Sequence, residues 1–231
     1  MLVLGDAHAD DPDRRRALLA AYRESDADVA LQTGDLLHYD LPTPTYFVAG
    51  NNEDFDVIDA LRRGEDSAPA EDSVHGEGLA PADSSAGATV RNATLLASSV
   101  AEVEGLRVAG LSGNYAPTKY DEARADLTGE RRRHFVREDV ARLKRVEDVD
   151  VLLTHEAPHG LVYYGYDAGC ERIDELLDAL EPDLCLVGHH ERHVEATYGD
   201  TRAVSLAPAW ERYYELDPET LELSDRATPT E

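Results

Sequence analysis

The sequence has little positive charge. Lys and Arg together number 22 against 48 Asp and Glu, which gives a formal net charge of −26, and only Lys119 and Lys144 are lysines. Such a surface repels polyanions at low salt and offers no basic stripe for nucleic acid. The repulsion weakens at high ionic strength, where the Debye length falls to ~3 Å near 1 M. We therefore expect a halophilic protein, with an ordinary acidic protein as the alternative and no support from charge for a nucleic-acid partner.

Cysteines and long apolar segments are also scarce. The two cysteines, Cys170 and Cys185, lie in different predicted elements, which excludes a disulfide framework and favours isolated buried thiols. No apolar run approaches the ~20 residues that a membrane span needs. A strand predicted from Met1 or Leu2 leaves no room for a presequence. We expect a cytoplasmic protein without a membrane partner, and the sequence carries no indication of its oligomeric state.

Five apolar segments each end in residues that can bind a metal ion. Asp35 follows the predicted strand 29–32 and the permissive Gly34, a suitable place for a cation at the mouth of an α/β sheet. Asp6 and His8 are two positions apart, so in an extended strand end their side chains share a face. The clusters are Asp6-Ala7-His8, Gly34-Asp35, Gly50-Asn51-Asn52-Glu53, Thr154-His155 and Gly188-His189-His190-Glu191.

The order of predicted elements indicates a layered α/β fold. Strands alternate with helices, and hairpins follow, which is the pattern of sheets covered by helices. We predict strands at 2–4, 29–32, 45–49, 149–153 and 184–187, and helices from Asp11-Pro12, near Val57, at 131–146 and at 171–180. We also predict a small antiparallel meander over 94–97, 100–103 and 106–111, a hairpin of 194–198 with 202–206, and an edge strand near Tyr213-Tyr214.

The chain of 231 residues is long enough for one domain with a sizeable core. We expect a single domain over residues 1–217, interrupted by a flexible acidic insertion at 64–88, and a peripheral tail at 218–231. The insertion contains many Gly, Ala, Ser, Pro and acidic residues and no Lys or Arg, so it has little apolar surface to bury.

The candidate ligands point to a site with two metal ions. Carboxylate, amide and imidazole groups suit Mn, Fe, Zn or Ni better than Ca²⁺ or Cu(I). Two metals ~3.5–4 Å apart clamp the attacking and leaving oxygens of a displacement at phosphorus, and they lower the pKa of a bound water. Too many groups are present for one ion: Asp6, His8, Asp35, Asn51, His155, His189 and the His190-Glu191 pair.

Five motifs occur in one order along the chain: Asp6-x-His8, Gly34-Asp35, Gly50-Asn51, His155 and Gly188-His189. This order resembles that of the calcineurin-like metallophosphoesterases, over about residues 1–195. The resemblance implies a β-sandwich flanked by helices with two divalent metals at the strand ends, Mn being expected and Fe, Zn or Ni the alternatives. It implies that Asp6 and His8 bind the first metal, that Asp35 bridges both, and that Asn51, His155 and His189 bind the second.

Two positions depart from the family's pattern. Asn52 stands where many members have a His that helps to protonate the leaving group, and this variation is similar to small prokaryotic phosphodiesterases that lack that His. Glu191 stands where the last motif usually has its second His. As a carboxylate it can bind the first metal, with His190 and His193 as alternatives.

The resemblance implies a metal-dependent phosphoester hydrolase. We expect a phosphodiesterase that uses a metal-bound hydroxide on a small phosphoester or nucleotide-type substrate, with a phosphomonoesterase or a catalytically silent metal-binding scaffold as alternatives. The candidate catalytic residues are His38, Asn52 and His159. Of these, His159 is a candidate proton donor to the leaving group, and His38 either supports the metal ligands or is a simple loop residue.

Three further features concern the substrate. Residues 111–115 and 133–137 together with His155 are similar to stretches of the RNA lariat debranching enzymes of the same superfamily, which is a weaker likeness. The basic run 131–133 favours a solvated helix start over a phosphate-binding cluster. The tyrosines Tyr163, Tyr164 and Tyr166 favour packing in the core or at its rim over a pocket for a base.

Overall fold

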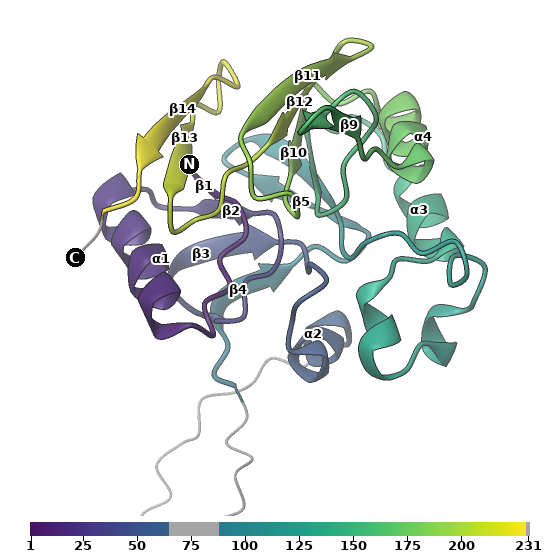
Figure 1. Ribbon diagram of the computed structural model, residues 1–231, viewed down its shortest axis with the longest axis horizontal. Helices are drawn as coiled ribbons and strands as arrows, with labels where there is room; N and C mark the ends of the chain where they lie inside the picture. Colours follow the sequence, from purple (N-terminus) through teal and green to yellow (C-terminus); the bar gives the residue numbers. More distant parts are fainter. Residues whose placement is uncertain (65–87, 230–231) are drawn as a thin grey trace, which may run out of the picture.

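A computed structural model describes residues 1–64 and 88–229 of the chain (Figure 1). Two six-stranded sheets lie face to face, and helices cover their outer sides. The predicted layered α/β fold is therefore confirmed. The expected acidic insertion falls almost entirely outside the described residues.

The strands and helices have the following bounds. The first sheet contains β1 (Leu2–Leu4), β2 (Ala30–Gln32), β3 (Asp40–Phe47), β4 (Arg91–Leu95), β13 (Arg212–Leu216) and β14 (Leu223–Ala227). The second contains β5 (Ser99–Val103), β6 (Leu106–Leu111), β7 (Val151–Thr154), β10 (Leu184–Val187), β11 (Val194–Tyr198) and β12 (Thr201–Ser205). The hairpin of β8 (Val162–Tyr163) and β9 (Tyr166–Asp167) forms a separate small sheet. The helices are α1 (Pro12–Ser25), α2 (Phe55–Arg62), α3 (Arg137–Leu143) and α4 (Glu171–Leu180), with the 3-10 turns η1 (Arg124–Asp126) and η2 (Gly129–Arg133).

Parallel strands at the centre of both sheets direct their carboxyl ends to one region. The first sheet has the order β14-β13-β1-β2-β3-β4, in which β1 to β4 are parallel neighbours. The second has the order β11-β12-β10-β7-β6-β5, in which β12, β10, β7 and β6 are parallel neighbours. Ligands of open α/β sheets bind outside such strand ends.

Alternation along the central strands builds the core. In β1, Leu2 and Leu4 face outward and cluster with Leu18 of α1, whereas Val3 lies between the sheets in one cluster with Leu186 of β10. The outward residues of the second sheet pack against α3 and α4. The sandwich therefore has α1 on one outer side and α3 and α4 on the other (Figure 1).

The two clearest helix predictions are confirmed. Asp11 caps α1, because its carboxylate accepts from the backbone N–H groups of Asp13 at 2.8 Å and Arg14 at 3.1 Å, and Pro12 occupies the first turn. Helix α4 has the predicted bounds and buries Ile173 and Leu177 on its apolar face.

The predicted meander over 94–111 is wrong. Strand β4 pairs in parallel with β3 in the first sheet, whereas β5 and β6 form an antiparallel pair in the second. The chain changes sheets at Ser98, which has φ 59°. Leu96 crosses closely over Gly110 of β6, where a Cβ would lie 2.9 Å from the Leu96 carbonyl oxygen. Only glycine allows this close approach of the two sheets.

The predicted helix over 131–146 is also wrong in its first half. After η2 the backbone is extended at His134 and pairs with Asn114, and Phe135 donates to the Asn114 carbonyl at 3.2 Å. Helix α3 begins only at Arg137, and Asp139 accepts from the backbone N–H of Val136 at 2.9 Å. Phe135 is buried although its segment is extended, and in the sequence this apolar residue resembled part of the apolar face of a helix.

The first sheet contains more of the carboxyl-terminal residues than the sequence predicts. Strand β13 is not an edge strand, because it lies between β1 and β14. The segment from residue 218, for which we expected a peripheral tail, contributes β14 to the edge of the sheet. Among the described residues, no helix combines the length and apolar character needed to cross a membrane.

Candidate metal centre

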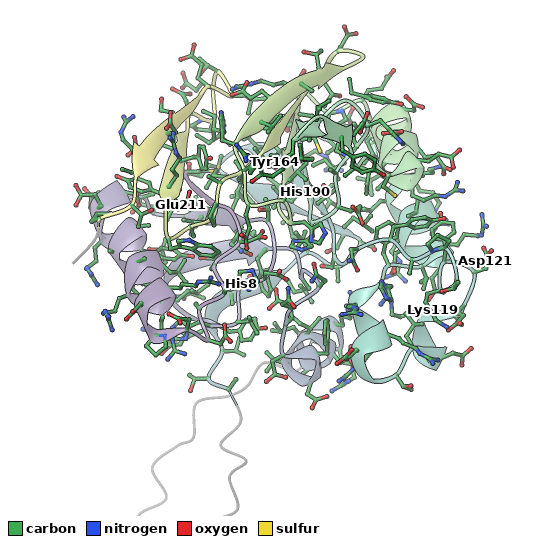
Figure 2. All side chains as sticks on the ribbon, in the orientation of Figure 1. His8, Lys119, Asp121, Tyr164, His190 and Glu211 are labelled. Carbon is green, nitrogen blue, oxygen red and sulfur yellow. The ribbon has the colours of Figure 1, made fainter. Side chains whose placement is uncertain are left out.

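Two neighbouring strands deliver the first candidate ligands. Asp6 and His8 follow β1 and Asp35 follows β2, so parallel pairing brings the three residues together. Their potential ligand atoms all lie within 4.8 Å of one another. Nε2 of His8 is 3.5 Å from Oδ2 of Asp35, and the side chains of both aspartates are 2% exposed. Figure 2 shows His8 near the middle of the molecule.

Several ligands occupy the left-handed region of backbone conformation. The φ angles are 44° at His8, 52° at Asp35, 71° at His189 and 51° at Glu191. Such conformations cost free energy in residues other than glycine and concentrate at functional sites. Here the turn after β2 is held in place, because its Asp35 carbonyl accepts from the backbone N–H of His8 at 2.7 Å.

His155 follows β7 of the second sheet and lies beside residues that follow β2 and β3 of the first sheet. Its Nδ1 lies 2.9 Å from the carbonyl oxygen of Thr33, so Nδ1–H donates there and Nε2 is directed at the opposite side. That Nε2 lies 3.0 Å from Oδ1 of Asn51 and 3.7 Å from Oδ2 of Asp35. The lone pair of Nε2 and these oxygens suit a cation between them, either a proton or a metal ion.

The segment after β10 supplies the remaining members of the cluster, His189 and Glu191. The backbone N–H of His189 lies 3.0 and 3.1 Å from the two carboxylate oxygens of Asp6, and its ring centroid is 5.0 Å from that of His155. Oε1 of Glu191 lies 3.4 Å from Nε2 of His8. Every predicted ligand therefore contacts another member of the cluster through a hydrogen bond, an ion pair or a ring contact.

The two alternatives to Glu191 have other partners. The ring of His190 stacks on Tyr163 with centroids 3.8 Å apart. His193 stacks on Tyr214 at 5.6 Å and places its Nε2 3.3 Å from Glu195. Among the three candidates for the last ligand, Glu191 alone forms an ion pair with His8 within the described residues.

The three predicted catalytic residues differ in position. Asn52 lies at the cluster and donates twice to the Asp35 carboxylate, from its backbone N–H at 2.7 Å and from Nδ2 at 2.8 Å. His159 instead pairs with Asp174 of α4 at 2.6 Å. His38 interacts with Arg15 and Asp40. Neither histidine forms a hydrogen bond or ion pair with the cluster in the part of the chain that the structure describes.

Two supporting residues were absent from the predicted set. The carboxylate of Glu53 accepts from the backbone N–H groups of Leu36 at 3.1 Å and Gly50 at 3.2 Å and from the Tyr39 hydroxyl at 2.6 Å. The Gln32 side chain donates to the carbonyl of Gly5 at 3.1 Å and accepts from the N–H of Gly34 at 2.9 Å. Both residues fix loops that carry ligands. Glu53 was visible in the sequence as the last residue of its cluster.

Glycines create the space in which the ligands meet. A Cβ at Gly50 would lie 2.6 Å from the backbone nitrogen of Asp35 and 2.7 Å from the His155 ring. At Gly188 it would lie 2.6 Å from Oδ1 of Asp6. The glycine that precedes each ligand in these motifs is therefore required by packing.

The electrostatics of the centre favour a bound cation. Burial raises the pKa of Asp6 to about 6, and the Asp35 carboxylate adds to this rise while His155 opposes it. Burial disfavours the charged form of His155, but the carboxylates of Asp6 and Asp35 outweigh it and raise its pKa. No Lys or Arg among the described residues forms an ion pair with either aspartate; their ion-pair partners are histidines. Divalent metals, which bind buried carboxylates and imidazoles, fit this donor set.

Comparison with known proteins gives a family match and structures of similar fold. The sequence matches the family described as calcineurin-like phosphoesterase over residues 1–191. A search of curated proteins found no match. One crystal structure is 14% identical and aligns over 99% of this chain and 98% of that chain with a TM-score of 0.68. The crystal structure of TT1561 of Thermus thermophilus is 16% identical and aligns over 99% and 98% with a TM-score of 0.62. Both likenesses concern the fold.

Proposed function

Because the chain belongs to the calcineurin-like phosphoesterase family, we propose that it is a phosphodiesterase that works with two divalent metal ions, preferentially Mn. One observation carries the proposal. Oδ2 of Asp35 is close to two imidazole nitrogens, 3.5 Å from Nε2 of His8 and 3.7 Å from Nε2 of His155. A single buried carboxylate oxygen facing ligands on both sides suits a bridge between two ions.

The ligands divide into two sets around this bridge. Asp6, His8 and Glu191 would hold the first ion, and Asn51, His155 and His189 would hold the second. When bound, two such ions neutralise negative charge at phosphorus and make a water molecule acidic enough to ionise near neutral pH.

The residues of the chain orient these ligands. The Thr33 carbonyl selects the His155 tautomer with a free Nε2, and the His189 backbone N–H fixes the Asp6 carboxylate. Asn52 holds Asp35 through two hydrogen bonds and has no titrating proton. Protonation of the leaving group therefore falls to water, or to a loop residue such as His159, which in the structure pairs with Asp174 and would have to leave that partner.

Charge favours a diester over a monoester. The formal net charge of the chain is −26, and the centre itself contains Asp6, Asp35 and Glu191. A monoester is largely dianionic at neutral pH, whereas a diester carries one negative charge. The field of the protein therefore opposes the approach of a monoester more strongly.

The test compares bis(p-nitrophenyl) phosphate with p-nitrophenyl phosphate in the presence of Mn²⁺, at low ionic strength, where the field of the protein is little screened, and again at molar salt. We expect faster turnover of the diester, and loss of that turnover in Asp35→Asn. Faster turnover of the monoester would make the protein a phosphomonoesterase. Bound metal without turnover of either compound would make it a silent scaffold, and absence of metal binding would contradict the proposal altogether.

A further inference from the structure

We propose that the cavity beside Glu191 binds the nucleoside part of the substrate, and that the exposed ring of Tyr164 stacks on its base. This inference rests on the proposed function, since it places the organic part of the phosphodiester next to the metal centre. The cavity has a volume of about 490 Å³, within the range of roughly 300–1,000 Å³ that is usual for small-molecule sites. Its lining includes Tyr164, Glu191, Arg192, His193, Glu211 and Arg212.

The cavity borders the metal centre at two residues of its lining. Glu191 lines the cavity and also places Oε1 3.4 Å from Nε2 of His8. Ala207 lines it too, and its backbone packs against Gly5, where a Cβ would lie 3.2 Å from the Ala207 carbonyl carbon. Gly5 directly precedes Asp6. A group attached to a phosphorus atom at the metals can therefore extend into this cavity.

The hairpin of β8 and β9 presents an aromatic ring to the cavity. Three of its side chains are exposed apolar groups: Tyr164 is 88% exposed, Tyr166 71% and Val162 48%. Tyr164 stands in the turn with φ 51°, a left-handed conformation that directs it out of the hairpin. Tyr164 and Glu211, both labelled in Figure 2, belong to the lining of this cavity.

The hairpin is joined to the ligand segment by two stacked pairs. Tyr163 stacks on His190 with ring centroids 3.8 Å apart, and the guanidinium carbon of Arg192 lies 4.2 Å from the ring centroid of Tyr164. These residues flank Glu191. The second pair combines an aromatic ring with a flat cation, and both are surfaces on which nucleobases stack.

The charges of the cavity favour a nucleoside over a second phosphate. Glu191 and Glu211 balance Arg192 and Arg212, and Arg212 is already paired with Asp225. His193 is directed to Glu195 at 3.3 Å. The lining therefore has no excess of positive charge for another anion. The Glu211 carboxylate, which the metal centre does not use, suits ribose hydroxyls and the amino groups of bases, which donate hydrogen bonds.

The test measures binding of AMP and of ribose 5-phosphate to the Mn-loaded full chain by equilibrium dialysis, with each ligand quantified by chromatography. The two ligands share ribose and phosphate and differ in the base. We expect AMP to bind about tenfold more tightly, a usual contribution of one stacked base. Tyr164→Ala should abolish this difference and Tyr164→Phe should retain it. Tyr166→Ala, on the same hairpin but outside the cavity lining, should leave it unchanged.

Equal affinities for the two ligands in the unaltered protein would overturn the inference, as would a preference for AMP that survives in Tyr164→Ala. Both side chains are exposed, so the variants should unfold at the same temperature as the unaltered protein. The outcome is independent of catalysis. Diester turnover without a preference for AMP contradicts only the nucleoside site, whereas a preference for AMP without diester turnover contradicts only the proposed reaction.

Discussion

The Nδ1 atom of His155 lies 2.9 Å from the carbonyl oxygen of Thr33, and this contact ties β7 of the second sheet to the end of β2 in the first. The carbonyl can only accept, so the imidazole proton must be on Nδ1 and the lone pair on Nε2. The Nε2 atom then faces Asn51 and Asp35. One backbone carbonyl thus connects the two sheets and fixes the position of the proton on a candidate ligand.

Divalent metal should stabilise the fold substantially. Buried Asp6 and Asp35 repel each other in the metal-free protein, and a metal that binds only the folded state shifts unfolding by mass action. At a free Mn²⁺ concentration of about 100 times Kd this amounts to ~2.7 kcal/mol, or about 5–10 °C in Tm for a chain of this length. Differential scanning calorimetry with Mn²⁺ and with EDTA measures the shift.

The matched control is Asp35→Asn, which keeps the size of the side chain and removes its charge. Its Tm should respond to Mn²⁺ much less than that of the unaltered protein. An equal response in both proteins would place the metal elsewhere.

Acidification should weaken metal binding. The metal binds ionised carboxylates and neutral imidazoles, so protons compete with it. Burial raises the pKa of Asp6 to about 6, and the neighbouring carboxylates raise that of His155, so both groups take up protons as the pH falls through this range. Mn²⁺ affinity should be nearly constant at high pH and fall by at least ~10-fold per pH unit below about pH 6.

Isothermal titration calorimetry between pH 5 and pH 8 provides the measurement. Proton release on binding, detected with buffers of different ionisation enthalpy, should increase toward low pH. A flat affinity over this range would show that the carboxylates are already ionised and the imidazoles already neutral without the metal.

A methyl group at Gly50 should disrupt the centre. The added Cβ would lie 2.6 Å from the backbone nitrogen of Asp35 and 2.7 Å from the His155 ring, so both ligands must shift. We expect Gly50→Ala to weaken Mn²⁺ binding at least ~10-fold, since metal ligands need well-defined geometry. Gly64→Ala serves as the control, because nothing lies within 4 Å of its Cβ and only its φ of +71° opposes the change. Metal affinity that survives in Gly50→Ala would argue against a role for the glycine in ligand placement.

Glu53 should stabilise the loops that carry Asp35 and Asn51. Replacement by Ala leaves buried donors of Leu36, Gly50 and Tyr39 without their acceptor. Unmade buried hydrogen bonds cost ~1–3 kcal/mol each, so we expect a loss of about 3–5 kcal/mol and a Tm lower by roughly 10 °C. Chemical denaturation of Glu53→Ala beside Glu53→Gln tests this, because the amide keeps one acceptor oxygen and should lose about half as much. Equal stability of all three proteins would mean that the loops are held by other contacts.

Local patterns allowed much of the fold and the centre to be predicted. Short apolar segments with a polar residue at their end identified Asp6, Asp35 and His155 as strand-end groups, because burial and strand termination are local properties of the sequence. Parallel pairing then brings such groups together. The cap of α1 at Asp11 and the bounds of α4 followed from equally local signals.

Features that depend on distant partners were not predicted. The apolar residues of β4 gave no indication that this strand pairs with β3 rather than β5, since pairing depends on which sheet the chain enters after Ser98. Phe135 is buried in an extended segment that pairs with Asn114, yet its neighbour Val136 lies four positions before Val140, which also fits a helix. The exposure of Tyr164 depends on a turn conformation that the sequence Tyr-Tyr-Gly-Tyr does not disclose.

The hairpin of β8 and β9 belongs to neither large sheet and meets the ligand segment through the stacked pairs at His190 and Arg192. Its turn can therefore change in length or composition without altering any strand that supplies a metal ligand. If Tyr164 contacts the substrate as proposed, substrate preference and hydrolytic chemistry should be separable by mutation, and replacing the exposed residues 164–166 while keeping the buried Tyr163 is a route to redirecting this scaffold toward other phosphoesters.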